Sequence, residues 1–267
     1  ILPHLSHVPG AHMLDVHPPH ESVHSWKDFL IHMMAICLGL LIAVGLEQTV
    51  EWVHHRHQRQ ELAEQMRAEA RRNIPVIRES IRRLDAQAEY IRAIENALSA
   101  GKVSGDTVAV SGVTPSGGSV FYISPSRAAW STAQTAGIAA LLPADQSNLY
   151  SRLDFEASHE VEAEDDMEAK LSTLVSVCAS AHYDHTSTTV SRITIEHRDD
   201  LIFHLQQVGS SVRTMSNKLS LVEGADEAIL AGVQSLDQMY AFQNAALARA
   251  NVTSSPVLFY GGSSKFN

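Results

Sequence analysis

Three glutamate–histidine pairs have a spacing that could support metal chemistry. Each follows the pattern Glu-x-x-His, and they are Glu21/His24, Glu51/His54 and Glu156/His159. In di-iron carboxylate bundles, two such pairs on facing helices meet two further glutamates, all pointing inward. Here the pairs fall in a proline-rich tail, beside an apolar segment and on a polar helix face. Since the chain has 15 histidines, chance pairs are expected, and the sequence predicts no di-metal site.

Two other polar clusters are better explained by helix ends than by catalysis. His182, Asp184 and His185 follow a helical pattern and suit a C-terminal cap, and the acidic run 196–200 suits a first helical turn. No pair of carboxylates gives a reason to expect a shifted pKa. Signatures of serine hydrolases, zinc proteases, P-loop proteins and dinucleotide-binding proteins do not occur, so the sequence predicts no enzyme.

Composition favours a helical protein. Aromatic residues make up 6% of the 267 residues, while alanine, leucine, serine and glutamate are plentiful. The net charge of −10 argues against a general nucleic-acid binder. Because Cys37 lies in an apolar stretch and Cys178 far downstream, we expect two free thiols.

The most informative segment is the apolar stretch Phe29–Leu46, whose 18 residues include one polar side chain, His32. That length meets the lower limit for a membrane-spanning helix. Trp26 and Lys27 precede it, and Trp52 and Arg56 follow it, where anchors at the membrane interface are expected. We predict a transmembrane helix over residues 28–53. A buried helix of a soluble bundle is the alternative, and a cleaved signal peptide fits poorly because no A-x-A-like site follows.

Within this segment, small residues recur every four positions. Ala35, Gly39 and Ala43 line one helix face, which Glu47 continues, and such a face lets a second helix approach closely in lipid. His32 allows two interpretations. In the first, it has a function in the membrane, as a ligand to a haem or pigment metal or as a hydrogen-bonding group toward a partner helix. In the second, it lies at a shallow depth and simply reaches the headgroups.

The flanks bear on topology. Residues 1–27 form a tail rich in histidine and proline, which predicts irregular structure and adventitious metal binding at most. Arginines concentrate after the apolar segment, at positions 56, 59, 67, 71 and 72, against Lys27 alone before it. This bias predicts a cytoplasmic C-terminal domain, although the low lysine and high serine and threonine content downstream also suits the periplasm.

Residues 54–250 are predicted to form a helical extramembrane domain. An apolar seam runs from Ile77 to Leu98, with a kink or restart expected at Pro75. Residues 101–126 form an irregular insert, with a hairpin expected between TVAVSG and SVFYIS. A short helix then runs from Ser126 to Pro143, with Trp130 as a buried anchor.

Two longer helical patterns follow. Residues 144–190 predict a long helix in which 160–170 is a solvated face. The seam that begins at Leu201 steps by four and three residues through Val222, and it predicts either one helix over 197–250 or two helices broken near Gly224. Residues 251–267 read as a C-terminal tail.

Several stretches resemble a group of uncharacterised bacterial single-pass membrane proteins. They are DFLIHMMAICLGLLIAVGLEQTVEWVHHRHQ (28–58), LAEQMRAEARRNIPVI (62–77), SRAAWSTAQTAGIAALLP (126–143) and LYSRLD (149–154). The resemblance covers roughly residues 17–155. It implies a membrane span that runs directly into a helical domain and a non-enzymatic role, and it carries no known activity, cofactor or site residue.

These observations predict a mainly α fold with one transmembrane helix, a long-helix bundle and a small irregular or hairpin insert. The expected function is that of a structural or accessory subunit or scaffold in a bacterial inner membrane. Its expected partners are the lipid bilayer and either other membrane subunits or further copies of itself. The alternatives are an accessory subunit of an electron-transfer or light-harvesting complex, with His32 at a cofactor, and a helical-bundle sensor domain.

Overall fold

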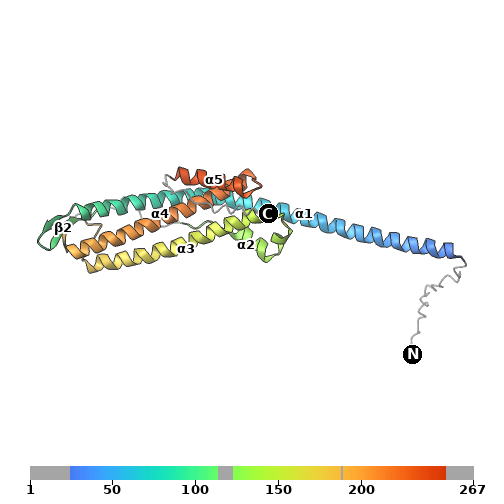
Figure 1. Ribbon diagram of the computed structural model, residues 1–267, viewed down its shortest axis with the longest axis horizontal. Helices are drawn as coiled ribbons and strands as arrows, with labels where there is room; N and C mark the ends of the chain where they lie inside the picture. The colour runs from blue at the N-terminus through green and yellow to red at the C-terminus, as the bar shows by residue number, and fades with distance from the viewer. Residues whose placement is uncertain (1–24, 114–122, 188, 251–267) are drawn as a thin grey trace, which may run out of the picture. The chain divides into compact units, whose positions relative to one another are not determined.

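The computed structural model describes residues 25–113, 123–187 and 189–250, and these are mainly helical (Figure 1). The α-helices are α1 (Trp26–Ser99), α2 (Ala128–Thr135), α3 (Ala144–Ser180), α4 (Ile195–Ala231) and α5 (Leu236–Arg249). A 3-10 helix, η1 (Ile138–Leu141), and three strands, β1 (Lys102–Ser104), β2 (Thr107–Ser111) and β3 (Val190–Thr194), complete the elements. The chain divides into two units, residues 1–54 and 55–267. The predictions for residues 1–24 and 251–267 lie outside the described residues.

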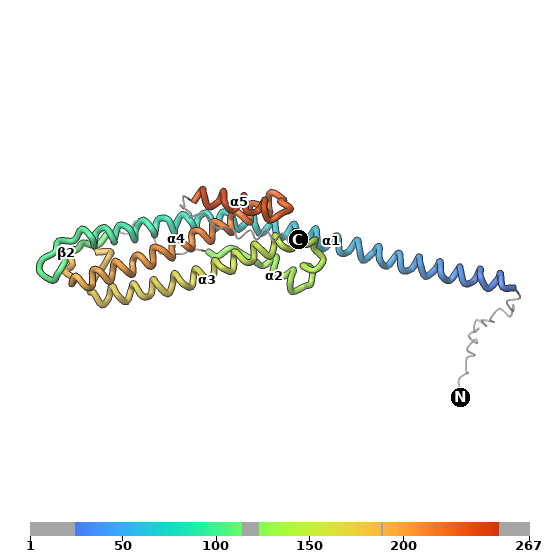
Figure 2. Tube along the Cα trace, viewed as in Figure 1, coloured from blue at the N-terminus to red at the C-terminus, as the bar shows by residue number. Residues whose placement is uncertain are grey.

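The second unit is a bundle whose long helices are α3, α4 and the part of α1 after residue 54 (Figure 2). Arg78 of α1 reaches Glu223 of α4, and further along α1 Ile91 lies against Gly209. These two contacts show that α1 and α4 run antiparallel. The α5 helix folds back onto the C-terminal half of α4, since Gln243 donates a hydrogen bond to the carbonyl of Leu221.

The predicted seams form the core of this bundle. Every member of the α4 seam between Leu201 and Val222 is buried, as are Ile77, Leu84 and Leu98 of α1. Trp130 is 3% exposed, which confirms that it is a buried anchor. Helical spacing of apolar residues therefore placed the core correctly, because burial of one apolar stripe per helix is what holds a bundle together.

The restart expected at Pro75 does not occur, and neither does the break near Gly224 that was one of two alternatives for residues 197–250. α1 continues through Pro75, which lies on the exposed side of the helix, and α4 continues through Gly224. Residues 197–250 nevertheless form two helices, because α4 ends at Gly232, whose φ of 71° is the left-handed conformation that glycine adopts readily. α5 restarts after Ser235, whose side chain accepts a hydrogen bond from the backbone N–H of Gln238.

A small antiparallel sheet, ordered β1-β2-β3, joins the end of α1 to the start of α4. The predicted TVAVSG strand is present as β2, and Val108 and Val110 are buried. Its partners are β1 and the distant β3, with Val108 opposite Ile193. The other predicted strand, SVFYIS, lies mostly outside the described residues. The long helix predicted over 144–190 is shorter than expected, since α3 ends at Ser180.

Candidate functional site

The apolar segment of α1 is exposed along its whole length. Every residue from Ser25 to His54 is exposed, and Leu41 exposes 70% of its surface. A window of 18 residues within α1 has a mean hydropathy of 2.5 and no buried residue, so the helix is long and apolar enough to cross a membrane. A core helix of a soluble bundle would be mostly covered by its own chain, and this segment is not.

The small-residue face and the anchors lie on this exposed segment. A Cβ added at Gly39 would meet nothing within 4 Å, so the face of Ala35, Gly39, Ala43 and Glu47 is open to a neighbour. Trp26 stacks on Phe29, with ring centroids 5.3 Å apart, and both Trp26 and Trp52 are more than half exposed. Arg56 is exposed as well.

His32 has a local hydrogen bond. Its Nδ1 lies 3.0 Å from the carbonyl oxygen of Asp28, one turn earlier. Because a carbonyl can only accept, this contact requires the proton on Nδ1 and leaves Nε2 as the nitrogen with a free lone pair. Nδ1 therefore has its hydrogen-bond partner within the same helix, and Nε2 is the nitrogen that a metal could bind.

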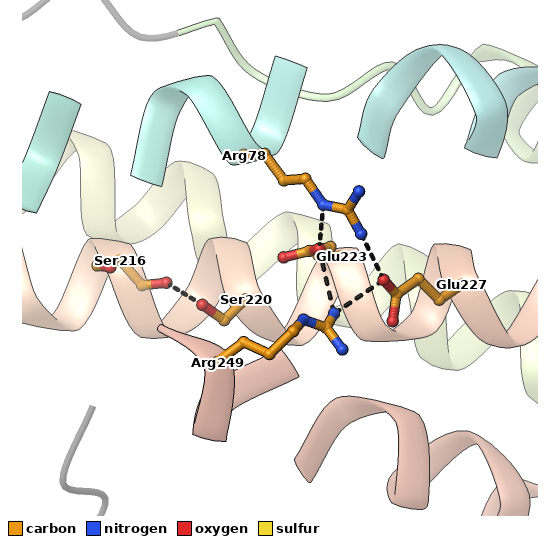
Figure 3. A network of polar contacts seen from close by, with 6 residues as sticks. All are labelled: Arg78, Ser216, Ser220, Glu223, Glu227 and Arg249. Atoms are coloured by element: carbon orange, nitrogen blue, oxygen red, sulfur yellow. Dashed lines mark hydrogen bonds and ion pairs between the residues drawn. The ribbon is translucent and has the colours of Figure 1, made fainter. Parts of the chain in front are cut away.

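A charged network links three helices of the bundle (Figure 3). Arg78 of α1 donates to Glu223 and Glu227 of α4 at 2.7 Å in both cases, and Arg249 of α5 reaches the same carboxylates at 3.1 and 2.8 Å. The side chain of Glu223 is only 5% exposed. Two guanidinium groups compensate its charge, so this network supports the fold and contains no group free for chemistry.

A second polar cluster positions the loop before α2. The buried carboxylate of Glu69 accepts hydrogen bonds from the Ser126 hydroxyl and the Ala129 backbone N–H. The Asn73 side-chain amide donates to the backbone carbonyl of Ser126 and accepts from its backbone N–H. Asp226 of α4 lies in the electrostatic field of Glu69 and has one carboxylate oxygen without a partner among the described residues.

Burial raises the pKa of Asp226 to about 7, and the nearby Glu69 carboxylate adds to this effect while a hydrogen bond from Asn73 opposes it. Glu160 behaves similarly. Burial and the neighbouring Glu164 raise its pKa to about 7, against the opposing charge of Arg127. The sequence patterns showed no reason for either pKa shift, and both shifts arise mainly from burial. Glu160 is also an exception to the predicted solvated face over 160–170.

The sequence contained a signal for these acids. Asp226 continues the four-three spacing of Leu219 and Val222, and Glu160 continues that of Leu149 and Leu153. An acidic residue at a seam position is expected to be buried. Their pKa shifts depend on other neighbours as well, and Glu69 comes from a distant part of the chain.

The Glu-x-x-His pairs do not form a metal site in the described residues. Glu156 is buried and pairs with Arg152, whereas His159 bonds Glu162 at 2.9 Å. Within the described ranges no group of three or more metal-ligating side chains comes together. The cluster after α3 lies at a helix end, as predicted. Asp184 accepts hydrogen bonds from Thr186, which lower the pKa of Asp184, and α4 starts with a Thr194 cap near the acidic run.

An apolar cavity of about 90 Å³ lies between α1, α3 and α4. Its apolar lining comes from all three helices, and Tyr90, Cys178, Tyr183 and His185 add polar groups. The Tyr90 hydroxyl lies 2.8 Å from His185 Nδ1. Burial raises the pKa of the Cys178 thiol and raises that of Tyr183 to about 12. Both groups are neutral near pH 7, so Cys178 lacks the thiolate that a nucleophile needs. Cys37 and Cys178 are both free thiols, as predicted.

No known protein family, curated protein or solved structure matches the chain. The resemblance to bacterial single-pass membrane proteins is therefore still a prediction, and the functional proposal depends on the geometry described above.

Proposed function

We propose that this chain is a non-enzymatic, single-pass membrane protein that acts as a structural or accessory subunit or scaffold. The observation that carries the proposal is the composition of α1. Its first part is apolar and entirely exposed, and its later part supplies buried core residues of the bundle. Lipid and a partner helix are the surroundings that would cover such an apolar surface. The bacterial inner membrane, with the bundle on the cytoplasmic side according to the arginine bias, is part of this proposal.

The small-residue face is the proposed contact for a partner helix or a second copy. Gly39→Leu tests this directly, because leucine at this open position would hold two helices apart. Gly45→Leu is the matched control, since Gly45 is equally open but lies on another side of the helix. The full chain is extracted in mild detergent and analysed by size exclusion with light scattering and mass spectrometry. We expect Gly39→Leu to lose the oligomer or partner and Gly45→Leu to keep it. A wild-type chain that is monomeric and free of partners would refute the proposal.

A sensor is the second candidate, and the cavity beside Tyr90 and Cys178 favours it. Its volume of about 90 Å³ is below the ~150 Å³ of a protein cavity known to hold benzene, so it suits a ligand of few atoms. A thermal-shift screen of the full chain with small apolar compounds tests this candidate. The absence of any stabilisation would count against it. The cofactor alternative at His32 is checked by the absorption spectrum of the same preparation, since a haem or pigment would colour the peak.

A further inference from the structure

A polar groove of about 520 Å³ lies on the bundle unit where α1 passes the start of α3. One side is formed by α1 and includes Arg56, Arg59, Glu64 and Arg67, and the other is formed by Pro143 and Gln146. The groove thus contains three guanidinium groups and one carboxylate, which makes it electropositive in a chain of net charge −10.

Two arginines of this groove lack the carboxylate partner that several other arginines of the bundle have. Arg78, Arg127, Arg152 and Arg249 all form ion pairs with carboxylates. Among the described residues, neither Arg59 nor Arg67 forms an ion pair, even though Glu64 lines the same groove. Arginine is the side chain best suited to bind an anion with several oxygens, because its planar group donates two parallel hydrogen bonds.

We propose that this groove binds the phosphate-bearing headgroup of an anionic phospholipid. The proposal rests on the membrane anchoring argued above, because Arg56 follows the end of the predicted span at Val53 by three residues. Basic clusters directly after a span attract anionic lipids. Arg59 lies about 9 Å beyond Val53 along the helix axis at about 1.5 Å per residue, within reach of a headgroup phosphate, and Arg67 extends the positive charge of the groove about 12 Å further.

Native mass spectrometry of the full chain in detergent tests the proposal. The chain is titrated with phosphatidylglycerol and with phosphatidylcholine of the same acyl chains, and separately with inorganic phosphate. The double variant Arg59→Gln/Arg67→Gln removes two guanidinium groups from the groove. The matched control is Arg71→Gln/Arg72→Gln, which removes the same charge from exposed positions of the same helix outside the groove. Thermal melting establishes that each variant is folded.

We expect the wild-type chain to prefer phosphatidylglycerol and the groove variant to bind it about tenfold more weakly, while the control keeps its affinity. Equal binding of both lipids would overturn the proposal, as would an equal loss in both variants. Saturation by inorganic phosphate alone, with no preference between the lipids, would show a site for a soluble anion and overturn the lipid assignment. The assay uses solubilised chain in any oligomeric state, so its outcome is independent of the Gly39 test.

Discussion

Asp226 and Glu160 are acidic side chains enclosed by the bundle, and both have a pKa raised to about 7. An aspartate in the unfolded chain has a pKa of about 3.9. The folded state therefore holds a proton on Asp226 that the unfolded state releases between these two values. The resulting stabilisation is fully present below pH ~4 and is lost as the pH rises through about 7.

Asp226→Asn removes this titration. We expect the variant to melt a few degrees higher than the wild-type chain at pH 8, where the wild type must bury a charge. At pH 5 the gain should be smaller, because the wild-type carboxyl is then protonated in the fold. Melting followed by circular dichroism at both pH values measures the effect. Asp165→Asn, at an exposed position of α3, is the control, and an equal response of the two variants would contradict the assignment.

At the residue scale, burial could be predicted from the sequence, whereas the pKa values of the buried acids could not. The spacing of Leu219, Val222 and Asp226 is visible in the chain and points to burial. The pKa of Asp226 also depends on Glu69 and Asn73 of α1, and no pattern local to α4 shows that these side chains are nearby. The same holds for the pairing of Arg78 with Glu223.

At the scale of elements, Gly224 lies where α4 and α5 approach each other closely. A Cβ at this position would lie 2.4 Å from the Cα of Gln243, and backbone cannot yield as a flexible side chain would. We expect Gly224→Ala to lower the free energy of unfolding by roughly 1–3 kcal/mol.

Gly209→Ala is the matched control in the same helix. Its added Cβ would meet the Ile91 side chain at an ordinary 3.6 Å, and alanine favours helix over glycine by about 1 kcal/mol. We therefore expect Gly209→Ala to be neutral or stabilising. Chemical denaturation of both variants measures the difference, and equal stabilities would show that α5 does not pack closely on Gly224.

The helices could be predicted because the spacing of their apolar residues is a local property of the sequence. The position of the break between α4 and α5 could not be predicted in this way. Gly224 and Gly232 look alike in sequence, yet one is required by the approach of α5 and the other by a left-handed backbone. The pairing of β2 with β3 joins strands far apart in the chain, and a period-two pattern cannot identify a partner at that distance.

For the whole molecule, the central claim is that α1 anchors the chain in a membrane. Composition and periodicity predicted the mainly helical fold, and the structure adds that the apolar segment is exposed along its whole length. Neither identifies the partner, since Ala35, Gly39 and Ala43 define an open surface and not what covers it.

The most direct measurement is alkaline carbonate washing of membranes from cells that express the full chain, followed by peptide mapping of pellet and wash. We expect the wild-type chain in the pellet with residues 26–53 intact. Leu40→Asp/Leu41→Asp should move chain into the wash, because each aspartate at the centre of a span costs about 3 kcal/mol. Wild-type chain in the wash, or pelleted chain lacking residues 26–53, would contradict the account.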